Sequence, residues 1–266
     1  MNKIPDTEVA DPGWKSLYRI GGAAALAAGI VFRRNLGVEI ALFSAQKHPD
    51  SIIDWYRLLQ TNRLLGLAYL NIFDIINYAL VGLMFLALVV LLRRVNKSYT
   101  AIAALLGFLG IAVYFASNTA FTLLSLSDQY ASATGEAQRT PLLSAGQAML
   151  ALNRFSSSGA QPGSGGYLSL LLIAAAGMIF SFVMLRSKLF GRATAYAGIL
   201  ANGLDLVYCT VFAFTTTAIA GLLAVLFIPA AGLFFLIWHV LVGWRLFQLG
   251  RLEVRKDASQ PIIKRR

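Results

Sequence analysis

Long apolar segments separated by short polar ones dominate the chain. A membrane-spanning helix needs about 20 apolar residues, and six segments of the sequence reach or approach that length. This pattern predicts an all-α fold, a polytopic membrane helix bundle with six transmembrane helices in a single integral membrane domain over residues 1–266. The predicted spans lie at about residues 17–32, 64–92, 100–126, 167–185, 193–214 and 218–244.

The first predicted span is the weakest of the set. Its uncharged core runs only from Ile20 to Phe32, and its small residues also fit the cleavage region of a signal peptide. The 19 residues before this core carry no net positive charge, and Arg33 and Arg34 follow it directly. We therefore interpret it as a retained span. If it does not insert, the chain has five spans and an external N-terminus.

Two connections between spans are long enough to hold helices of their own. Residues 33–63 contain a segment that Asp50 or Ser51 can cap, and residues 127–166 contain one for which Thr140 is an N-cap candidate. Each segment places apolar side chains along one helical face. We expect both to be interfacial helices that lie on the bilayer, in preference to helices that dock a partner.

Composition supports the membrane assignment. Hydrophobic residues make up 58% and charged residues 13% of the chain, whereas a soluble domain has about 25% charged residues. The net charge of +11 does not indicate nucleic acid, because the basic residues cluster at the ends of apolar segments. The expected partners are the lipid bilayer and, as a further possibility, other membrane proteins. The oligomeric state is not indicated.

Basic residues also predict the orientation. They gather after the second span (93–97), after the fourth (186–192) and in the tail from Arg245. The positive-inside rule then places the N- and C-termini in the cytoplasm. The connection 33–63 opposes this assignment, since it carries Arg33, Arg34, Lys47, Arg57 and Arg63.

Two carboxylates lie inside the predicted spans. Asp74 stands in "NIFDIIN" between Asn71 and Asn77, and Asp205 stands in "NGLDLV" after Asn202. A carboxylate at the centre of a membrane helix costs about 2.5–3.5 kcal/mol on insertion scales. Such a group is therefore expected to face the bundle interior, to be protonated or to find hydrogen-bond partners.

The shared Asn-x-x-Asp pattern falls in the second and the fifth span. These positions are equivalent if the bundle consists of two inverted halves of three helices. Asn118, in the third span, is a candidate partner for the acids. Two interpretations stay open: the carboxylates fix helix packing through hydrogen bonds, or they form a proton or cation site.

Motifs for catalysis are not found in the sequence. It lacks HExxH, GxSxG and a phosphate-binding loop, and its two histidines and one cysteine form no cluster with metal-ligand spacing. We expect no enzymatic activity, no catalytic residues, no cofactor and no metal site.

The segments "LYRIGGAAALAAGIVF", "LLGLAYLNIFDIINYALVGLMFLAL" and "EAQRTPLLSAGQAMLALN" carry a resemblance. On these segments the chain resembles a family of bacterial multi-pass membrane proteins that is catalogued only as a domain of unknown function. The resemblance implies a six-helix integral protein of a bacterial cytoplasmic (inner) membrane and brings no activity or site residues.

Two functions are compatible with these features. The sequence favours an accessory or regulatory membrane protein that binds lipid or partner proteins. The alternative is a proton- or cation-coupled small-molecule transporter that uses the polar set Asp74, Asn71, Asn77, Asp205, Asn202 and Asn118.

Overall fold

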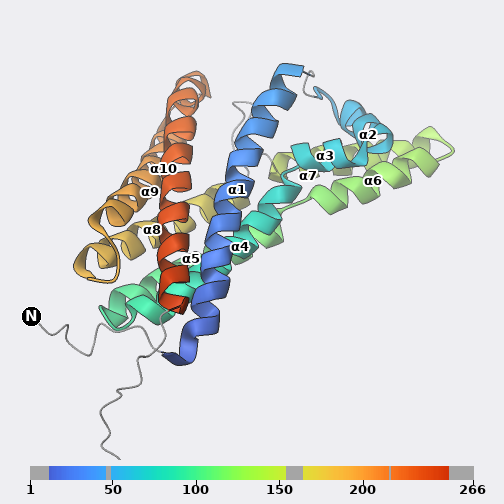
Figure 1. The fold of residues 1–266 in the computed structure, drawn as a ribbon. Helices are drawn as coiled ribbons and strands as arrows, with labels where there is room; N and C mark the ends of the chain where they lie inside the picture. The colour runs from blue at the N-terminus through green and yellow to red at the C-terminus, as the bar shows by residue number, and fades with distance from the viewer. Residues whose placement is uncertain (1–11, 46–48, 154–163, 216, 252–266) are drawn as a thin grey trace, which may run out of the picture.

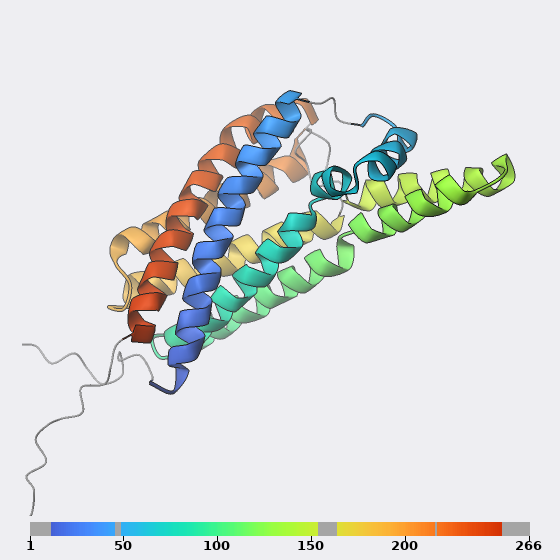
Figure 2. The ribbon, with the colours of Figure 1, turned by 45° about the vertical axis from the view of Figure 1, so that its right-hand side comes forward.

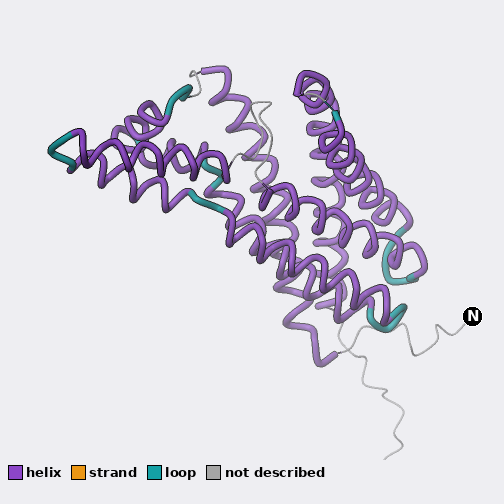
Figure 3. The backbone as a smooth tube through the Cα atoms, turned by 180° about the vertical axis from the view of Figure 1, so that it is seen from behind, coloured by secondary structure: helices purple, strands orange, loops and turns teal. Residues whose placement is uncertain are grey.

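The computed structural model describes residues 12–45, 49–153, 164–215 and 217–251, and within these ranges the chain forms helices joined by short loops (Figure 3). The elements are η2 (Pro12–Trp14), α1 (Lys15–Ala45), α2 (Ile52–Thr61), α3 (Arg63–Tyr69), α4 (Ile72–Leu92), α5 (Lys97–Ser117), α6 (Ala120–Ser132), α7 (Glu136–Asn153), α8 (Ser164–Arg186), α9 (Arg192–Phe214) and α10 (Thr217–Arg251).

Six long helices pack into a closed ring. Helix α1 lies against α4 and α10, α5 lies against α4 and α8, and α9 lies against α8 and α10. Figures 1 and 2 show these helices running alternately up and down, with the short helices α2, α3, α6 and α7 gathered beyond one end. The all-α fold class is thereby confirmed.

Four stretches of the described residues are long and apolar enough to cross a membrane: 72–92, 97–132, 164–186 and 229–251. Large apolar side chains on their outer faces, such as Leu86, Phe108 and Phe182, are exposed and present the surface that lipid covers. The first and fifth predicted spans correspond to α1 and α9, which are not among these four but pack along them.

Small residues let α1 approach its neighbours closely. Gly21, Ala25 and Gly29 form a ridge in the sequence that predicts close helix packing. A Cβ at Gly21 would lie only 2.4 Å from the Cβ of Ala87 in α4, and one at Gly29 would lie 3.4 Å from that of His239 in α10. The ridge thus seats α1 between its two partners in the ring.

The second predicted span, 64–92, is not one continuous helix. Helix α3 ends at Tyr69 and α4 begins at Ile72, and between them Asn71 has φ 61° and ψ 36°, in the left-handed region. Asparagine is one of the few residues other than glycine that adopt this conformation routinely. The single span that hydropathy predicts is therefore broken at Asn71.

The third predicted span, 100–126, is also broken. Helix α5 ends at Ser117, Asn118 adopts an extended backbone, and α6 continues from Ala120. The Asn118 side-chain oxygen accepts a hydrogen bond from the Ala120 N–H at 3.1 Å, which competes with the helical bond and restarts the chain in a new direction. Helix α6 then projects beyond the ring (Figure 2).

Helices α2, α3, α6 and α7 form a layer at this end of the ring, called the outer layer below. Ser51 caps α2 by accepting a hydrogen bond from the Asp54 N–H, as the sequence predicts. The apolar face of α2 is buried against α6 and α7, while its placement on a bilayer surface stays a prediction. The core of the layer comprises Ile52, Trp55, Tyr56, Leu59, Leu70, Ala120 and Leu123.

Polar contacts hold the outer layer together. The Tyr56 hydroxyl donates to the carbonyl of Leu142 at 2.7 Å, and the Ser127 hydroxyl donates to the carbonyl of Tyr56 at 3.1 Å. Burial, helped by the neighbouring Tyr130, raises the pKa of Tyr56 to about 12, so the phenol stays protonated and keeps its role as donor at neutral pH.

Helix α7 begins one turn earlier than predicted. Thr140 was the expected N-cap, but the helix starts at Glu136, and the Thr140 hydroxyl donates to the Glu136 carbonyl at 3.0 Å inside the helix. The Gly135 carbonyl accepts the first helical hydrogen bond, from the Arg139 N–H at 3.1 Å, and the Gln138 side chain accepts from the N–H of Thr134 at 3.1 Å, just before the helix.

Candidate functional site

Two stacked tyrosines form the centre of a polar cluster inside the ring. The rings of Tyr78 in α4 and Tyr114 in α5 lie 4.2 Å apart between their centroids. The Tyr114 hydroxyl donates to the carbonyl of Asn71 at 3.3 Å, and the Asn118 amide donates to the Tyr114 hydroxyl at 3.4 Å. The Asn118 amide also reaches the carbonyl of Leu70 at 3.5 Å. The two helix breaks therefore meet, and each supplies polar groups that the other needs.

Asp74 lies in the first turn of α4, and the break at Asn71 explains its position. The N-terminus of a helix carries unpaired N–H groups and a partial positive charge, which favour a carboxylate. The Tyr114 hydroxyl also lies within hydrogen-bonding reach of Asp74. Asp74 is thus at the start of a helix, roughly 28 Å along its axis from Arg93 at 1.5 Å per residue.

Asp205 lies on α9, on the other side of the ring from α4. The Tyr78 hydroxyl is within electrostatic range of both Asp74 and Asp205. Ser169, on α8, faces the Tyr78 hydroxyl as well. Its own hydroxyl is fully buried and has the Tyr78 hydroxyl as its polar neighbour.

The α8–α9 contact fixes the depth of Asp205. The Tyr167 hydroxyl on α8 donates to the carbonyl of Cys209 at 3.2 Å, one turn beyond Asp205. On the opposite side, Asn202 donates to the Gly198 carbonyl at 2.7 Å, and a Cβ at Gly177 of α8 would lie 2.1 Å from its side-chain oxygen. These two contacts bracket Asp205 between the levels of Tyr167 and Gly177 on α8.

The structure brings together only part of the predicted polar set. Asp74 and Asn118 lie at the Tyr114 hydroxyl, and Asp205 acts electrostatically on Tyr78. Asn71 contributes its backbone, through the break and its carbonyl. Asn202 packs against Gly177 of α8. Asn77 holds a buried side-chain oxygen for which the described residues provide no partner.

Sequence reasoning missed Tyr114 and Ser169. Tyr114 precedes Asn118 by four residues, so the spacing that places two residues on one helical face would have paired them. Ser169 stands alone in "YLSLLLI" and gives no such signal, because its importance depends on which helices surround it.

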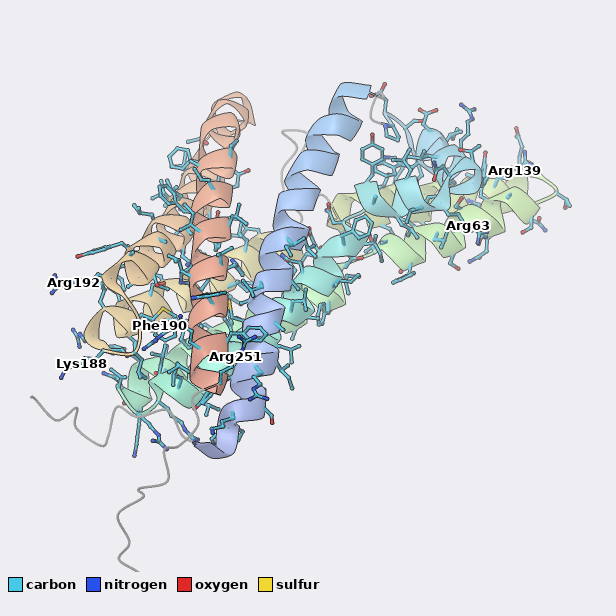
Figure 4. The ribbon with its side chains drawn as sticks, in the orientation of Figure 1. Arg63, Arg139, Lys188, Phe190, Arg192 and Arg251 are labelled. Atoms are coloured by element: carbon cyan, nitrogen blue, oxygen red, sulfur yellow. The ribbon has the colours of Figure 1, made fainter. Side chains whose placement is uncertain are left out.

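Chemically, the cluster offers oxygen atoms and negative charge. The described residues contain no group of three or more His, Cys, Asp or Glu side chains that could hold a metal ion. Figure 4 shows labelled basic side chains at the two ends of the molecule: Arg63 and Arg139 in the outer layer, and Lys188, Arg192 and Arg251 at the opposite end. A proton or a small hard cation is the partner that two carboxylates, phenols and a hydroxyl suit best.

Comparison with known proteins reaches the level of a family. A family model described as a domain of unknown function (DUF4386) matches residues 59–250. The match includes the second and third segments quoted for the resemblance, while 17–32 lies before it. No curated protein and no solved structure matches the chain.

Proposed function

We propose that this chain, which belongs to the DUF4386 family, is a transporter that couples the movement of a small molecule to a proton or cation. The observation that carries the proposal is the presence of two carboxylates, Asp74 and Asp205, that both act electrostatically on the buried Tyr78 hydroxyl. Acids within membrane helices are costly, and they commonly mark ion pathways and proton relays. A phenol that senses both acids offers a hydroxyl on the path of a proton or cation that moves through the ring.

The proposal includes six spans arranged as two inverted halves. If α1, α4 and α5 correspond to α8, α9 and α10, the contacts between helices repeat. Helix α1 packs on α4 as α8 packs on α9, and α5 packs on α8 as α10 packs on α1. In this scheme α4 and α9 are equivalent, and they carry Asp74 and Asp205. Inverted halves with a site near the midplane are typical of secondary transporters.

We further propose that the protein lies in a bacterial cytoplasmic membrane with both termini in the cytoplasm. Lys188, in the α8–α9 loop, and Arg139, in α7, are exposed at opposite ends of the molecule (Figure 4). A Lys188→Cys variant is expected to react with a membrane-impermeant maleimide only in inverted vesicles, and Arg139→Cys only in intact cells. The native Cys209 is buried, so the protein without an added cysteine gives the background level of labelling. The opposite labelling pattern would contradict the orientation.

Transport is tested by Asp205→Asn, which keeps hydrogen bonding and removes the titratable charge. Purified protein in liposomes should take up protons or Na⁺ under an imposed gradient, and the variant should lose this uptake by about tenfold or more. Asp128→Asn is the matched control, because Asp128 forms an exposed ion pair with Arg63 at 2.8 Å in the outer layer. Uptake by Asp205→Asn equal to that of the wild type would reject the transport proposal.

An accessory or regulatory role is the second candidate, and a specific surface favours it. Basic side chains gather at the ring end opposite the outer layer, where the described residues include no acid. Such a surface attracts anionic lipid head groups or an acidic partner. This role predicts normal lipid or partner binding in Asp205→Asn, with no ion uptake in either form. The basic side chains are Lys15, Arg19, Arg93, Arg94, Lys97, Arg186, Lys188, Arg192, Arg245 and Arg251.

A further inference from the structure

We infer that the end of the ring opposite the outer layer binds the head groups of anionic phospholipids. The inference goes beyond the proposed ion transport, and of the two partners named above for this surface it selects lipid. Basic side chains gather there, and the described residues around them include no acid (Figure 4). This set, called the basic end below, comprises Lys15, Arg19, Arg93, Arg94, Lys97, Arg186, Lys188, Arg192, Arg245 and Arg251.

Neutral groups hold several arginines of the basic end in place. Arg19 donates to the carbonyl of Gly250 at 3.0 Å. The Arg93 guanidinium lies 5.8 Å from the centre of the Trp14 ring, and that of Arg251 faces another aromatic ring at 5.6 Å. Carbonyls and aromatic faces orient a guanidinium, but they do not neutralise its charge. These arginines are therefore positioned by the protein and left to attract anions from outside it.

Basic side chains of the outer layer are arranged differently. Arg63 pairs with Asp128 at 2.8 Å, and Arg57 pairs with Asp54 at 3.5 Å. Acids also stand in the first turns of α2, α4 and α7, where a helix favours negative charge. Helices α1, α5 and α9, which start in the basic end, instead begin with a basic residue and have no acid in the first turn. Only at the basic end does the fold leave its positive charge for an external anion.

Exposed Trp and Tyr side chains mark the level of the lipid head groups. Among the described Trp and Tyr residues, the exposed ones all lie beside the basic end: Trp14, Tyr99, Tyr196 and Trp244. They stand on four different elements, η2, α5, α9 and α10, and each is within four residues of a basic side chain. Such residues favour the membrane–water interface, and basic side chains at that level reach lipid phosphates.

The rest of the chain does not supply the missing negative charge. Residues 1–11 and 252–266, which adjoin η2 and α10 in the sequence, carry five acids against six bases. Their charges nearly cancel, so they cannot balance the basic end. An acidic protein could match the charge, but it would not account for exposed aromatic side chains on four elements. A bilayer leaflet with anionic head groups accounts for both.

The test compares unfolding temperatures of the purified protein in micelles that contain phosphatidylglycerol or phosphatidylcholine, at equal lipid content and ionic strength. Phosphatidylglycerol at about ten times its dissociation constant is expected to raise the temperature by roughly 3–5 °C, and phosphatidylcholine by less than about 1 °C. A variant that combines Arg93→Gln, Lys97→Gln and Arg192→Gln should lose about half of the shift or more, because it removes charge from the basic end.

The matched control combines Arg57→Gln, Arg63→Gln and Arg139→Gln, which removes three charges from the outer layer and should leave the shift intact. If the basic-end variant does not fold, the exposed Arg192→Gln alone should show a smaller shift than the wild type.

Equal shifts with the two lipids, or a full shift in the basic-end variant, would overturn the inference. The same shift from inorganic phosphate or from polyglutamate would also overturn it, and the latter would assign the surface to an acidic partner. Ion uptake by liposomes is measured separately, so the two proposals fail independently. A lipid shift without uptake would reject transport alone, and uptake without a lipid shift would reject this surface alone.

Discussion

Replacing Gly198 by leucine is expected to prevent the ring from closing between α8, α9 and α10. A Cβ at Gly198 would lie 2.1 Å from the Ser181 hydroxyl oxygen and 2.5 Å from the indole nitrogen of Trp238. Both neighbours are among the most deeply buried side chains, so neither can move aside into open space. Overpacking of a filled interior costs about 1–3 kcal/mol and occasionally more, and a leucine at this contact belongs at the upper end.

The measurement is the yield of monodisperse protein in detergent together with its unfolding temperature. Gly191→Leu is the matched control, since a Cβ at Gly191 meets nothing within 4 Å. The milder Gly198→Ala should be destabilised as well, and adding Ser181→Ala should restore part of the loss by removing the nearest atom. Wild-type stability in Gly198→Leu would show that the three helices are not packed in this way.

Two substitutions at Asn71 are expected to differ sharply in their effect on stability. Asn71→Val should destabilise the protein by about 2 kcal/mol, because a β-branched residue strongly disfavours a φ of 61°. It should also weaken ion uptake, since the carbonyl of Asn71 accepts the Tyr114 hydroxyl that borders Asp74. Asn71→Gly should change neither property much, because glycine adopts this conformation without strain.

The pair separates backbone conformation from side-chain chemistry. Both variants lose the amide, which makes no capping hydrogen bond to α4. Unfolding temperature and liposome uptake are compared for the two variants under the same conditions. Equal damage in both would mean that the amide itself matters, and the break between α3 and α4 would then not be the reason for this asparagine.

Hydropathy was a sound guide to the long helices because burial in lipid depends on the average character of a segment. It located the apolar cores of α4, α5, α8 and α10, and the small residues of α1 predicted its close packing. The cap at Ser51 was also predictable, since it depends on residues within one turn.

The helix breaks were not predictable from the sequence by the same means. Asn71 and Asn118 lie in apolar surroundings, and an asparagine there fits a continuous helix as well as a break. What decides between them is tertiary: the carbonyls released in one break are met by the Tyr114 hydroxyl and the Asn118 amide from the other. Local pattern therefore placed Asp74 in mid-helix, whereas the fold places it at a helix start.

The residues of the candidate site were likewise predictable from the sequence only in part. The two acids and Asn118 stood out because polar residues are rare in such segments. Ser169 did not, because a serine costs a membrane helix little and its role depends on facing Tyr78. Asn202 shared the motif of Asp205 yet packs against Gly177, since only the helix arrangement determines which side faces the interior.

The contact between α1 and α10 also constrains how the protein is made. Arg19 donates to the carbonyl of Gly250 at 3.0 Å, and Gly22 of α1 packs directly against Gly243 of α10. A ribosome therefore completes α1 long before it synthesises the helix that covers it. Until α10 is made, the small-residue face of α1 has only α4 as a partner, and the synthesis of α10 closes the ring.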